Sequence, residues 1–375
     1  MISVAHLTSA HPRYDPRIFL KQCKGLVDHG YKVSLVVADG KGRESVEGVD
    51  ILDVGLLPGR INRILRTTER VFQAALDLKA DLYHLHDPEL IPAGLRLKRH
   101  GKRVIFDSHE DVPVQLLSKP YLNPWILRAL SGGYAVFEKF ACARFDGVVA
   151  ATPFIRDKFL KINPRTVDVC NYPALEEFTP SDDWCKKRNE VCYVGGVSAV
   201  RGARELVMAL AQVQTDVRLN LVGAFSDTDF RAELENTPGW SRINEFGVLD
   251  RNGVREVYAR SCAGLVTLHP ISNYLDALPI KMFEYMSAGI PVIASDFPLW
   301  RQIVLSADCG VCVDPLNPAA VAEAIDELGH NPARAQAMGR NGRMAVETRF
   351  NWKTEEAKLV AFYEQVLSPQ KRSFQ

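Results

Sequence analysis

The sequence predicts an α/β protein made of two doubly wound domains, and three observations support this fold class. A chain of 375 residues is longer than one hydrophobic core usually serves. Short β-branched segments alternate with helix-length amphipathic segments in both halves, which is typical of parallel sheets covered by helices. A polar, proline-containing stretch without periodicity interrupts the alternation once. We therefore expect domains at residues 1–170 and 190–350, a linker at 171–189 and a closing helical segment at 351–375.

The first half repeats the strand–helix unit several times. β-Branched and aromatic residues dominate the runs in which we expect strands, at residues 2–8, 32–38, 81–86, 103–108, 146–151 and 166–170. Apolar residues recur at helical spacing in the segments between them, near residues 14–29, 60–78, 88–99 and 121–144, with a short helix before the last strand. The alternation predicts a parallel sheet in this half.

The second half starts the pattern again after the linker. Strands are expected in the short buried-type runs at residues 191–196, 217–223, 242–247, 263–269, 291–295 and 309–313. Helices are expected near residues 201–213, 227–237, 250–260, 317–329, 331–347 and 351–367. Two domains of this kind bind ligands at the carboxyl ends of their strands, so we expect the functional residues in a cleft between them.

The composition excludes several classes of protein. Hydrophobic residues make up 47% of the chain and charged residues 24%, as in ordinary globular proteins. No uncharged apolar run of about 18 residues occurs, and the first residues lack a signal-peptide pattern, so we expect a cytoplasmic protein. The eight cysteines lie among apolar residues and imply no disulfide framework. Residues 1–170 carry an excess of Lys and Arg, which fits an anionic membrane surface or a phosphorylated acceptor, or chance surface composition.

The most informative stretch is DALPIKMFEYMSAGIPVIASD, at residues 276–296. Pro279 is suited to the first position of a helix, which places Lys281 and Glu284 three residues apart on one helix face. A diphosphate could bind at the helix N-terminus beside Lys281, and Glu284 could accept hydrogen bonds from two ribose hydroxyls. The alternative is a surface Lys–Glu pair without a ligand.

A second candidate site follows the strand at 191–194. Gly195 and Gly196 would let the backbone approach a phosphate closely, and Arg201 would offer a planar fork to the phosphate oxygens. The alternative is a tight strand-to-helix turn followed by an exposed arginine. The pattern is neither G-x-G-x-x-G nor a P-loop, so it gives no fingerprint of a dinucleotide dehydrogenase or an ATPase.

Several of these segments together resemble family four glycosyltransferases. GGVSAVRG, EFGVL, LPIKMFEYMSAGIPVIASD and RFNWKTEEAKLVAFYEQVL are similar, in order and spacing, to the C-terminal half of that family. HPRYDPRIF, GYKVSLVV and FDSHE resemble a bacterial subgroup that builds cell-surface polysaccharides. The resemblance implies the GT-B fold, with two Rossmann-like domains and a final helix at 351–375 that crosses back to the first. It also implies sugar transfer with retention, without a metal or cofactor, from a UDP or GDP sugar to a lipid-linked or oligosaccharide acceptor.

The resemblance also assigns roles in the second half. Glu284 matches the glutamate that binds the donor ribose, and Asp276 takes the place of a glutamate that contacts the donor sugar, with a side chain shorter by one methylene. Arg201 matches a phosphate-binding lysine, while Gly196 replaces an arginine, so Lys281 is expected to supply the second cation. The loop from Phe246 to Val248 corresponds to the segment that reads the base.

In the first half, His109 matches a histidine that touches the donor sugar in related enzymes. A lone histidine can instead be a structural group. His11, Arg13 and Asp15 crowd the end of the first strand and are expected to hold an acceptor phosphate or hydroxyl. The alternative is that Asp15 caps the following helix while the arginines are solvated.

A metal site is not expected. His84 and His86 end a predicted strand, but we expect the two side chains to point to opposite faces, and we expect Asp87 to be a helix N-cap. The basic excess is modest and no binding motif occurs, so nucleic acid is not an expected partner.

Peripheral contact with the inner membrane surface is a further expectation. Arginines recur on one face of a predicted helix, at residues 60, 63, 66 and 70, and SKPYLNPWILRALSGGYAVF combines aromatic, apolar and basic residues. A buried helix explains this second stretch equally well. Two other functions remain open: a nucleotide-sugar-binding relative without catalysis, and a GT-B epimerase that releases nucleotide diphosphate without an acceptor.

Overall fold

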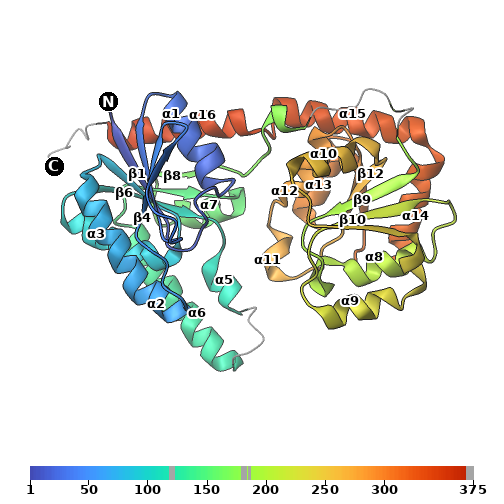
Figure 1. The fold of residues 1–375 in the computed structure, drawn as a ribbon, viewed down its shortest axis with the longest axis horizontal. Helices are drawn as coiled ribbons and strands as arrows, with labels where there is room; N and C mark the ends of the chain where they lie inside the picture. The colour runs from blue at the N-terminus through green and yellow to red at the C-terminus, as the bar shows by residue number, and fades with distance from the viewer. Residues whose placement is uncertain (118–122, 179–183, 185–186, 369–375) are drawn as a thin grey trace. The chain divides into compact units, whose positions relative to one another are not determined.

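The structure is a computed structural model that describes residues 1–117, 123–178, 184 and 187–368 (Figure 1). The chain divides into two compact units. The first contains Met1–Asn171 and Lys353–Gln375, and the second contains Tyr172–Trp352. Each unit is an α/β domain around a largely parallel sheet, which confirms the predicted fold class. Residues 172–178 of the predicted linker belong to the second unit, whereas residues 179–183 and 185–186 lie outside the described residues.

The first unit contains an eight-stranded sheet in the order β3-β4-β2-β1-β5-β6-β7-β8. Neighbouring strands run parallel, except that β3 and β4 form an antiparallel hairpin at one edge. The strands are β1 (Ser3–Leu7), β2 (Lys32–Val37), β3 (Glu44–Val46), β4 (Val49–Asp53), β5 (Leu82–Leu85), β6 (Arg103–Ser108), β7 (Gly147–Ala150) and β8 (Thr166–Asp168).

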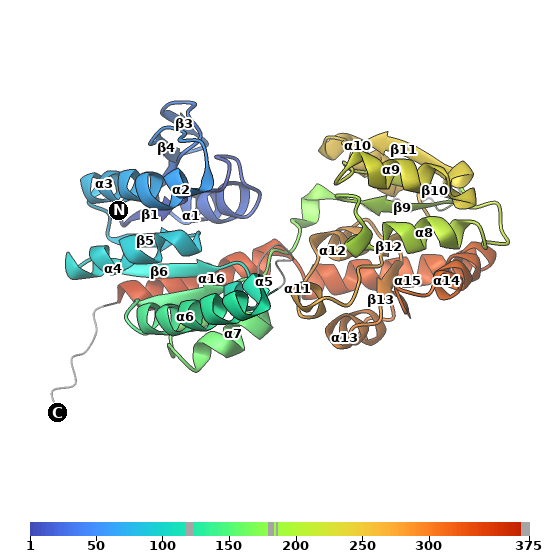
Figure 2. The same cartoon turned by 90° about the horizontal axis from the view of Figure 1, so that it is seen from below.

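Helices cover both faces of this sheet. A π-helical turn (Ile18–Cys23) leads into α1 (Lys24–Asp28), and α2 (Arg60–Asn62) continues through a π-helical turn (Arg63–Thr67) into α3 (Thr68–Leu78). The others are α4 (Ile91–Arg99), which follows a 3-10 turn (Pro88–Leu90), α5 (Val112–Leu117), α6 (Pro124–Cys142), α7 (Pro153–Leu160) and α16 (Trp352–Leu367). Figures 1 and 2 show α2 and α6 on the opposite side of the sheet from α16.

Side chains of β1, β5 and β6 alternate between the two faces of the sheet. One set packs into a hydrophobic core with α3, α4 and α6, and consists of Ala5, Leu7, Tyr83, Leu85, Val104 and Phe106. Successive strand residues point to opposite faces, so His6, His84 and Asp107 face the other side. There they meet α16, whose Tyr363 donates or accepts a hydrogen bond at His84. The period of two therefore gathers polar groups under the C-terminal helix.

The second unit contains a six-stranded, all-parallel sheet in the order β11-β10-β9-β12-β13-β14. Its strands are β9 (Glu190–Val194), β10 (Arg218–Val222), β11 (Ile243–Gly247), β12 (Ala263–Val266), β13 (Val292–Ser295) and β14 (Gly310–Val313). Counted from the first strand of the unit, this is the strand order 3-2-1-4-5-6 of a Rossmann-like sheet. The order in which strands are added across the sheet reverses between β9 and β12, so ligands are expected outside the carboxyl ends of these two strands.

The helices of the second unit lie on both faces of its sheet (Figure 1). The α8 and α14 helices pack into a core with the strands, while α10 and α12 lie on the other face. The helices are α8 (Ala203–Leu210), α9 (Thr228–Glu235), α10 (Arg251–Arg260), α11 (Ser272–Leu275), α12 (Ile280–Ser287), α13 (Pro298–Ser306), α14 (Pro318–His330) and α15 (Pro332–Thr348), with 3-10 turns at Leu175–Glu177, Ala199–Arg201 and Pro238–Arg242.

The structure corrects the sequence-based elements in several places. The β3–β4 hairpin was not predicted because its strands are short, and the helices α5, α11 and α13 were not predicted either. The first helix begins at Ile18 rather than near residue 14, because Asp15 caps it from outside. Pro279 is the N-cap residue of α12 and not its first helical residue. Among the described helices, none has the length and apolar character that a bilayer crossing requires.

Candidate active site

The loop after β9 gathers two cationic side chains around a pair of glycines. Gly195 has a φ of +132°, and a Cβ atom placed on it would lie 3.6 Å from Lys281 Nζ and 3.8 Å from Arg201 Nη1. The loop passes so close to the next strand that a Cβ on Gly223 would lie 2.0 Å from the Gly195 carbonyl oxygen. Glycine is therefore favoured at position 195 by its positive φ and required at position 223 by the lack of space for a side chain. The structure brings together four of the predicted phosphate-binding residues: Gly195, Gly196, Arg201 and Lys281.

Lys281 is the cation with the fewest partners in this group. Its Nζ atom is inaccessible to solvent and has no hydrogen-bond partner among the described residues. It lies 3.6 Å from the centre of the Tyr193 ring, a cation–π contact. Burial, together with repulsion from Arg201, lowers the pKa of Lys281 to about 7. An unpaired buried ammonium group is costly, so this site is electrostatically suited to an anion.

Glu284 lies one turn further along α12 and is buried. Its Oε1 accepts two hydrogen bonds of 3.0 Å from Arg251, and its Oε2 accepts one of 2.9 Å from Tyr258. Arg251 also pairs with Glu177. A carboxylate has about four acceptor positions, so Glu284 keeps capacity for one hydroxyl group without losing these partners. The surface Lys–Glu pair considered above does not form, since Lys281 and Glu284 have different surroundings.

The predicted base-reading loop borders an open pocket of about 460 Å³. Gly247 and Val248 line it from the end of β11, and Gly223 and Phe225 line it from the loop after β10. Val248 is 77% exposed. Phe246 instead lies against Arg260, whose guanidinium carbon is 4.7 Å from the ring centre. Asp276 ends α11 and is partly exposed, at the head of the segment that leads into α12.

In the first unit, His109 lies beside a buried carboxylate. Its Nε2 is 3.5 Å from Asp107 Oδ2, at the end of β6. Asp107 is fully buried and accepts hydrogen bonds from Arg17 and from Gln22. Burial by itself raises the pKa of Asp107, but the charge of Arg17 and the ring of His109 outweigh it and hold this pKa well below its usual value. The carboxylate therefore stays ionised and fixes the position of His109.

The first loop shows the capping role that was considered for Asp15. Asp15 caps the helix that follows, accepting hydrogen bonds from the backbone N–H groups of Arg17 and Ile18. It also lies 3.3 Å from His11, whose second ring nitrogen is 3.4 Å from Asp87. Burial lowers the pKa of His11, but the hydrogen bond with Asp15 and the charge of Asp87 raise it more, so the net shift is upward. His11 and Asp15 thus remain part of a polar surface next to His109.

Arg13 has a different position from the one predicted. It is 4% exposed, and its guanidinium is bound by Asp39 and Glu44 and by the Gly42 carbonyl oxygen. These contacts join the first loop to the β3–β4 hairpin. Its donors are therefore engaged within the protein, and the alternative in which this arginine is solvated is wrong.

Two expectations about the end of β5 are wrong. His84 and His86 are two residues apart, so they point to the same face of the sheet, and their ring centres lie 4.6 Å apart. Asp87 precedes a helical turn but makes no capping bond there; its carboxylate instead accepts from Thr8 and from the Ser9 backbone. Ligand atoms of His6, His84 and His86 lie within 4.8 Å of one another, as do those of His86, Asp107 and His109, so spacing alone does not exclude a metal.

Sequence reasoning missed Asp107, Arg251 and Tyr258. Asp107 lies in the motif FDSHE, two residues before His109, and this spacing at the end of β6 could have indicated a pair on one side of the sheet. Arg251 and Tyr258 carry no local signal, because they reach Glu284 from a different helix, α10.

Two family models match this chain one after the other. Residues 17–173 match a glycosyl transferase 4-like domain, and residues 176–345 match the glycosyl transferases group 1. The chain belongs to the family four glycosyltransferases. The glycosyltransferase is 27% identical over 265 residues to alpha-maltose-1-phosphate synthase from Mycolicibacterium smegmatis. The aligned region covers 62% of this chain and 67% of that protein.

Solved structures of similar proteins confirm the GT-B fold of this glycosyltransferase. Sucrose-phosphate synthase from Thermosynechococcus elongatus superposes with a TM-score of 0.79 at 19% identity, covering 98% of this chain and 99% of that one. HepE from Anabaena, in complex with UDP and glucose, gives a TM-score of 0.75 at 15% identity, covering 97% and 100% of the two chains. The two units therefore correspond to the two domains of this fold.

Proposed function

We propose that this glycosyltransferase takes a sugar of the hexose type from a UDP or GDP sugar and transfers it, with retention and without a metal ion, to a lipid-linked or oligosaccharide acceptor. The acceptor would belong to cell-surface polysaccharide biosynthesis. One observation carries this proposal. The Nζ atom of Lys281 is shielded from solvent, has no hydrogen-bond partner among the described residues, and lies beside the Gly195 loop together with Arg201.

The diphosphate of the donor is the anion that this loop fits best. Two phosphate groups need two cationic partners, and Lys281 Nζ and Arg201 Nη1 lie 3.6 Å and 3.8 Å from the position that a Cβ atom on Gly195 would take. Binding a diphosphate would give Lys281 the counter-charge that it lacks in the free protein. The HepE structure, which contains UDP and glucose, supports a nucleotide-sugar donor.

The nucleoside would then extend from the loop toward β10 and β11. The ribose would use the remaining acceptor capacity of Glu284, and the base would enter the pocket bordered by Gly247 and Val248. The backbone N–H and C=O groups of the loop from Phe246 to Val248 would form hydrogen bonds with the base, so the base preference would depend on this loop. Asp276 would contact a hydroxyl of the donor sugar.

The chemistry requires stabilisation of the leaving group. The bond between the anomeric carbon and the phosphate oxygen breaks, the acceptor oxygen bonds to the same face of that carbon, and the acceptor proton moves to a phosphate oxygen. Charge therefore grows on the departing diphosphate, where Lys281 and Arg201 would balance it. Preorganised donors of this kind typically contribute roughly 3 to 4 kcal/mol each to transition-state stabilisation. With two protein cations in this role, a metal ion is not needed.

The first unit would contribute to the reacting end of the donor and to the acceptor. His109 is held by Asp107 and is partly exposed, so it could bind a hydroxyl of the donor sugar. His11 and Asp15 form the neighbouring polar surface, with the rings of His11 and His109 5.0 Å apart. We propose that this pair binds an acceptor hydroxyl or phosphate, and that Arg13 only supports the loop.

A lipid-linked acceptor would place the enzyme at the inner face of the cytoplasmic membrane. The α6 helix buries Leu127 and Cys142, yet Trp125 and Val136 are 75% and 73% exposed. The segment at Arg60–Thr67 exposes Ile61 and Leu65, next to exposed arginines. The α2 and α6 helices lie on the same side of the first unit's sheet, opposite α16 (Figure 1). Apolar and basic side chains in this combination favour an anionic lipid surface, so we propose peripheral association.

Ligand-dependent thermal stability tests the donor proposal. A panel of nucleoside diphosphates and their sugars should include one class that raises the melting temperature, because a ligand bound to the native state stabilises it by mass action. Arg201→Ala and Lys281→Ala should abolish this shift. Arg204→Ala is the matched control, since Arg204 is exposed and pairs with Glu233 on the neighbouring helix. Equal shifts in all four proteins would refute the site.

The stereochemistry and metal requirement need the active enzyme. Proton NMR of the product should show the anomeric configuration of the donor, and activity should survive exhaustive chelation with EDTA. Inversion at the anomeric carbon, or complete and Mg²⁺-reversible loss of activity on chelation, would contradict the proposed mechanism.

A further inference from the structure

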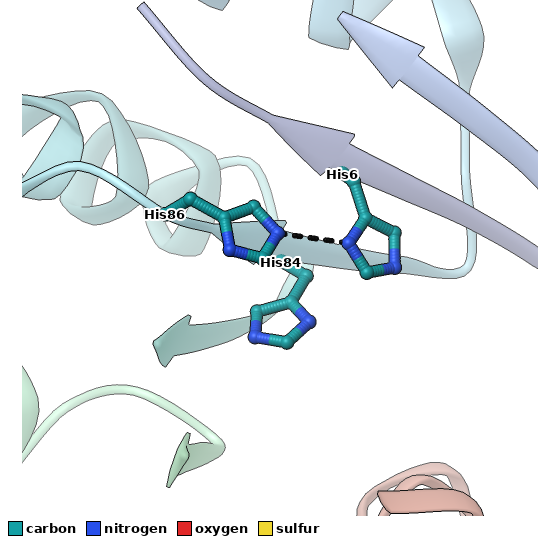
Figure 3. A group of neighbouring side chains, drawn as sticks. All are labelled: His6, His84 and His86. Carbon is teal, nitrogen blue, oxygen red and sulfur yellow. Dashed lines mark hydrogen bonds between the residues drawn. The ribbon is translucent and has the colours of Figure 1, made fainter. Parts of the chain in front are cut away.

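Four histidines and one tyrosine form a continuous chain of close polar contacts in the first unit. His109 Nε2 lies 3.4 Å from His86 Nδ1, and His86 Nε2 lies 2.8 Å from His6 Nδ1. His6 Nε2 is 3.3 Å from Tyr363 Oη, which is 2.6 Å from His84 Nδ1. Figure 3 shows the rings of His6 and His86 joined end to end, with His84 beside them.

This chain of polar contacts begins at the surface of the first unit and ends in its interior. The side chain of His109 is 20% exposed, whereas His6, His84 and Tyr363 are completely buried. Burial lowers the pKa of His6, His84 and His86, so these three rings are neutral near pH 7. A neutral imidazole carries one N–H donor and one acceptor nitrogen. Each of these contacts therefore holds a single proton. Because every ring has one donor and one acceptor, all donors along the chain of contacts must point in the same direction.

The distances favour hydrogen bonds over a shared metal ion. Nitrogen ligands of tetrahedral zinc lie about 2.0–2.1 Å from the metal, which separates them from one another by about 3.3 Å. The 2.8 Å between His6 and His86 is instead the length of a hydrogen bond. Tyr363 occupies the Nδ1 side of His84 in the same way. A metal at this site would need both contacts to open.

Asp107 decides in which of two directions the hydrogen-bond donors point along this chain of polar contacts. Its Oδ2 lies 3.8 Å from His84 Nε2, 3.5 Å from His86 Nδ1 and 3.5 Å from His109 Nε2. If the protons run from His109 toward His84, the N–H groups of His109 and His84 both face this carboxylate. In the opposite direction only His86 presents an N–H to it, and the buried lone pair of His84 Nε2 faces an anion without a donor. The first direction is therefore favoured, because it turns two N–H groups and one lone pair toward the carboxylate, and that lone pair, on His86 Nδ1, has a donor in His109.

We propose that His6, His84, His86 and Tyr363 are positioning residues that set the tautomer of His109. In the favoured direction all four histidines carry their proton on Nε2, and Tyr363 donates to His84 while it accepts from His6. His109 Nδ1 is then an unprotonated acceptor that is able to receive a hydrogen bond from a hydroxyl. That this hydroxyl belongs to the sugar rests on the proposed function; the tautomer itself does not.

We call the chain of contacts from His109 through His86, His6 and Tyr363 to His84 the histidine relay. It also gives the C-terminal helix a role at the site. Tyr363 lies on α16, 279 residues after His84, and supplies the single hydroxyl that joins the two halves of the chain of contacts. Without that hydroxyl, the His6 N–H loses its acceptor. The protons of His6 and His86 can then reverse, which directs the His86 N–H toward Asp107 and opposes an N–H on His109 Nε2.

Two-bond ¹H–¹⁵N spectra of the full chain labelled with ¹⁵N-histidine test the proposal without any substrate. The spectra of the free protein should show the Nε2–H tautomer for His6, His84, His86 and neutral His109, with single His→Gln variants assigning the signals. The Tyr363→Phe variant should shift His109 toward the Nδ1–H form. Tyr31→Phe is the control, because the Tyr31 ring packs edge-on against Tyr363 but takes no part in the relay.

Three results would overturn the proposal. The first is a Nδ1–H tautomer for His6, His84 or His86 in the unsubstituted protein, a measurement that needs no variant to fold. The second is a folded Tyr363→Phe protein in which the His109 signals match those of the Tyr31→Phe control. The third is one zinc ion per chain by elemental analysis of the purified protein, with histidine signals that move on chelation. Failure of nucleotide binding would leave these readouts unaffected and would count against the proposed function alone.

Discussion

The ammonium nitrogen of Lys281 lies 3.6 Å from the centre of the Tyr193 ring and has no hydrogen-bond acceptor among the described residues. With a pKa lowered to about 7 by burial and by Arg201, Lys281 is only partly charged near neutral pH. A bound diphosphate would favour the charged form. In the proposed function, the charge of this residue would therefore be coupled to binding of the diphosphate.

The first prediction is a pH-dependent donor affinity. Above pH 7 the free protein must take up a proton at Lys281 as the diphosphate binds, so affinity should fall, by up to about tenfold per pH unit. Isothermal titration calorimetry with the preferred nucleoside diphosphate between pH 7 and 9 measures this slope, and buffers of different ionisation enthalpy measure the proton uptake. Lys281→Met should bind about 10 to 100 times more weakly and lose the slope. A flat profile in the unsubstituted protein would contradict this account.

The second prediction concerns recognition of the ribose by Glu284. A charged acceptor bonded to a sugar hydroxyl contributes about 1.5 to 3 kcal/mol, so the enzyme should bind a nucleoside diphosphate about 10 to 100 times more tightly than its deoxyribose analogue. Glu284→Gln should remove most of this preference while retaining the helix. The control is Glu323→Gln, an exposed change on α14 that should keep the full preference. Unchanged discrimination in Glu284→Gln would exclude the assignment.

The third prediction concerns the buried ion pair of Arg17 and Asp107. Asp107→Asn leaves the guanidinium of Arg17 buried without a counter-charge, which should reduce the free energy of unfolding by about 3 to 5 kcal/mol. Denaturant titration of the purified variant measures the loss. Asp157→Asn removes an exposed partner of Arg156 and should cost less than about 1 kcal/mol. Similar losses in the two variants would show that burial of the Arg17–Asp107 pair is not what matters.

The pKa of Asp107 gives this pair a defined pH dependence. The folded-state pKa lies below the unfolded value, so the stabilisation is present above the usual aspartate range and is lost as the pH falls through the folded-state pKa. Unfolding free energies of the unsubstituted protein should therefore decline toward acid pH. The Asp107→Asn variant should show a smaller decline over the same range, and an identical decline would assign the acid sensitivity to other groups.

The fourth prediction tests peripheral membrane association. Flotation with vesicles that contain anionic phospholipid should recover the protein with the lipid, and neutral vesicles should recover much less. Replacing Trp125 and Leu65 with serine removes two exposed apolar side chains and should reduce recovery several-fold. Leu305→Ser is the control, because Leu305 is half-exposed on the second unit. No recovery of the unsubstituted protein with anionic vesicles would remove this part of the proposal.

Local patterns predicted most elements of the fold. The alternation of strand and helix segments gave the two sheets, and the short hairpin at β3 and β4 was missed because its strands have three and five residues. The same patterns placed Lys281 and Arg201 near strand or helix ends, where phosphate groups bind. The sequence did not show that both cations approach one point above Gly195, because that depends on the packing of α12 against the strands.

The histidine relay shows where sequence information ended. The period of two places His84, His86 and Asp107 on particular faces of their strands, but not which strands are neighbours. Tertiary structure set β1 beside β5 and β5 beside β6, and brought Tyr363 over them from the end of the chain. Sequence alone determined the fold class, the family and most residues of the proposed nucleotide site, because these depend on local periodicity and contiguous motifs. Only long-range packing decided the partners of Glu284, Arg13 and His109, since their contacts join segments that no local pattern connects.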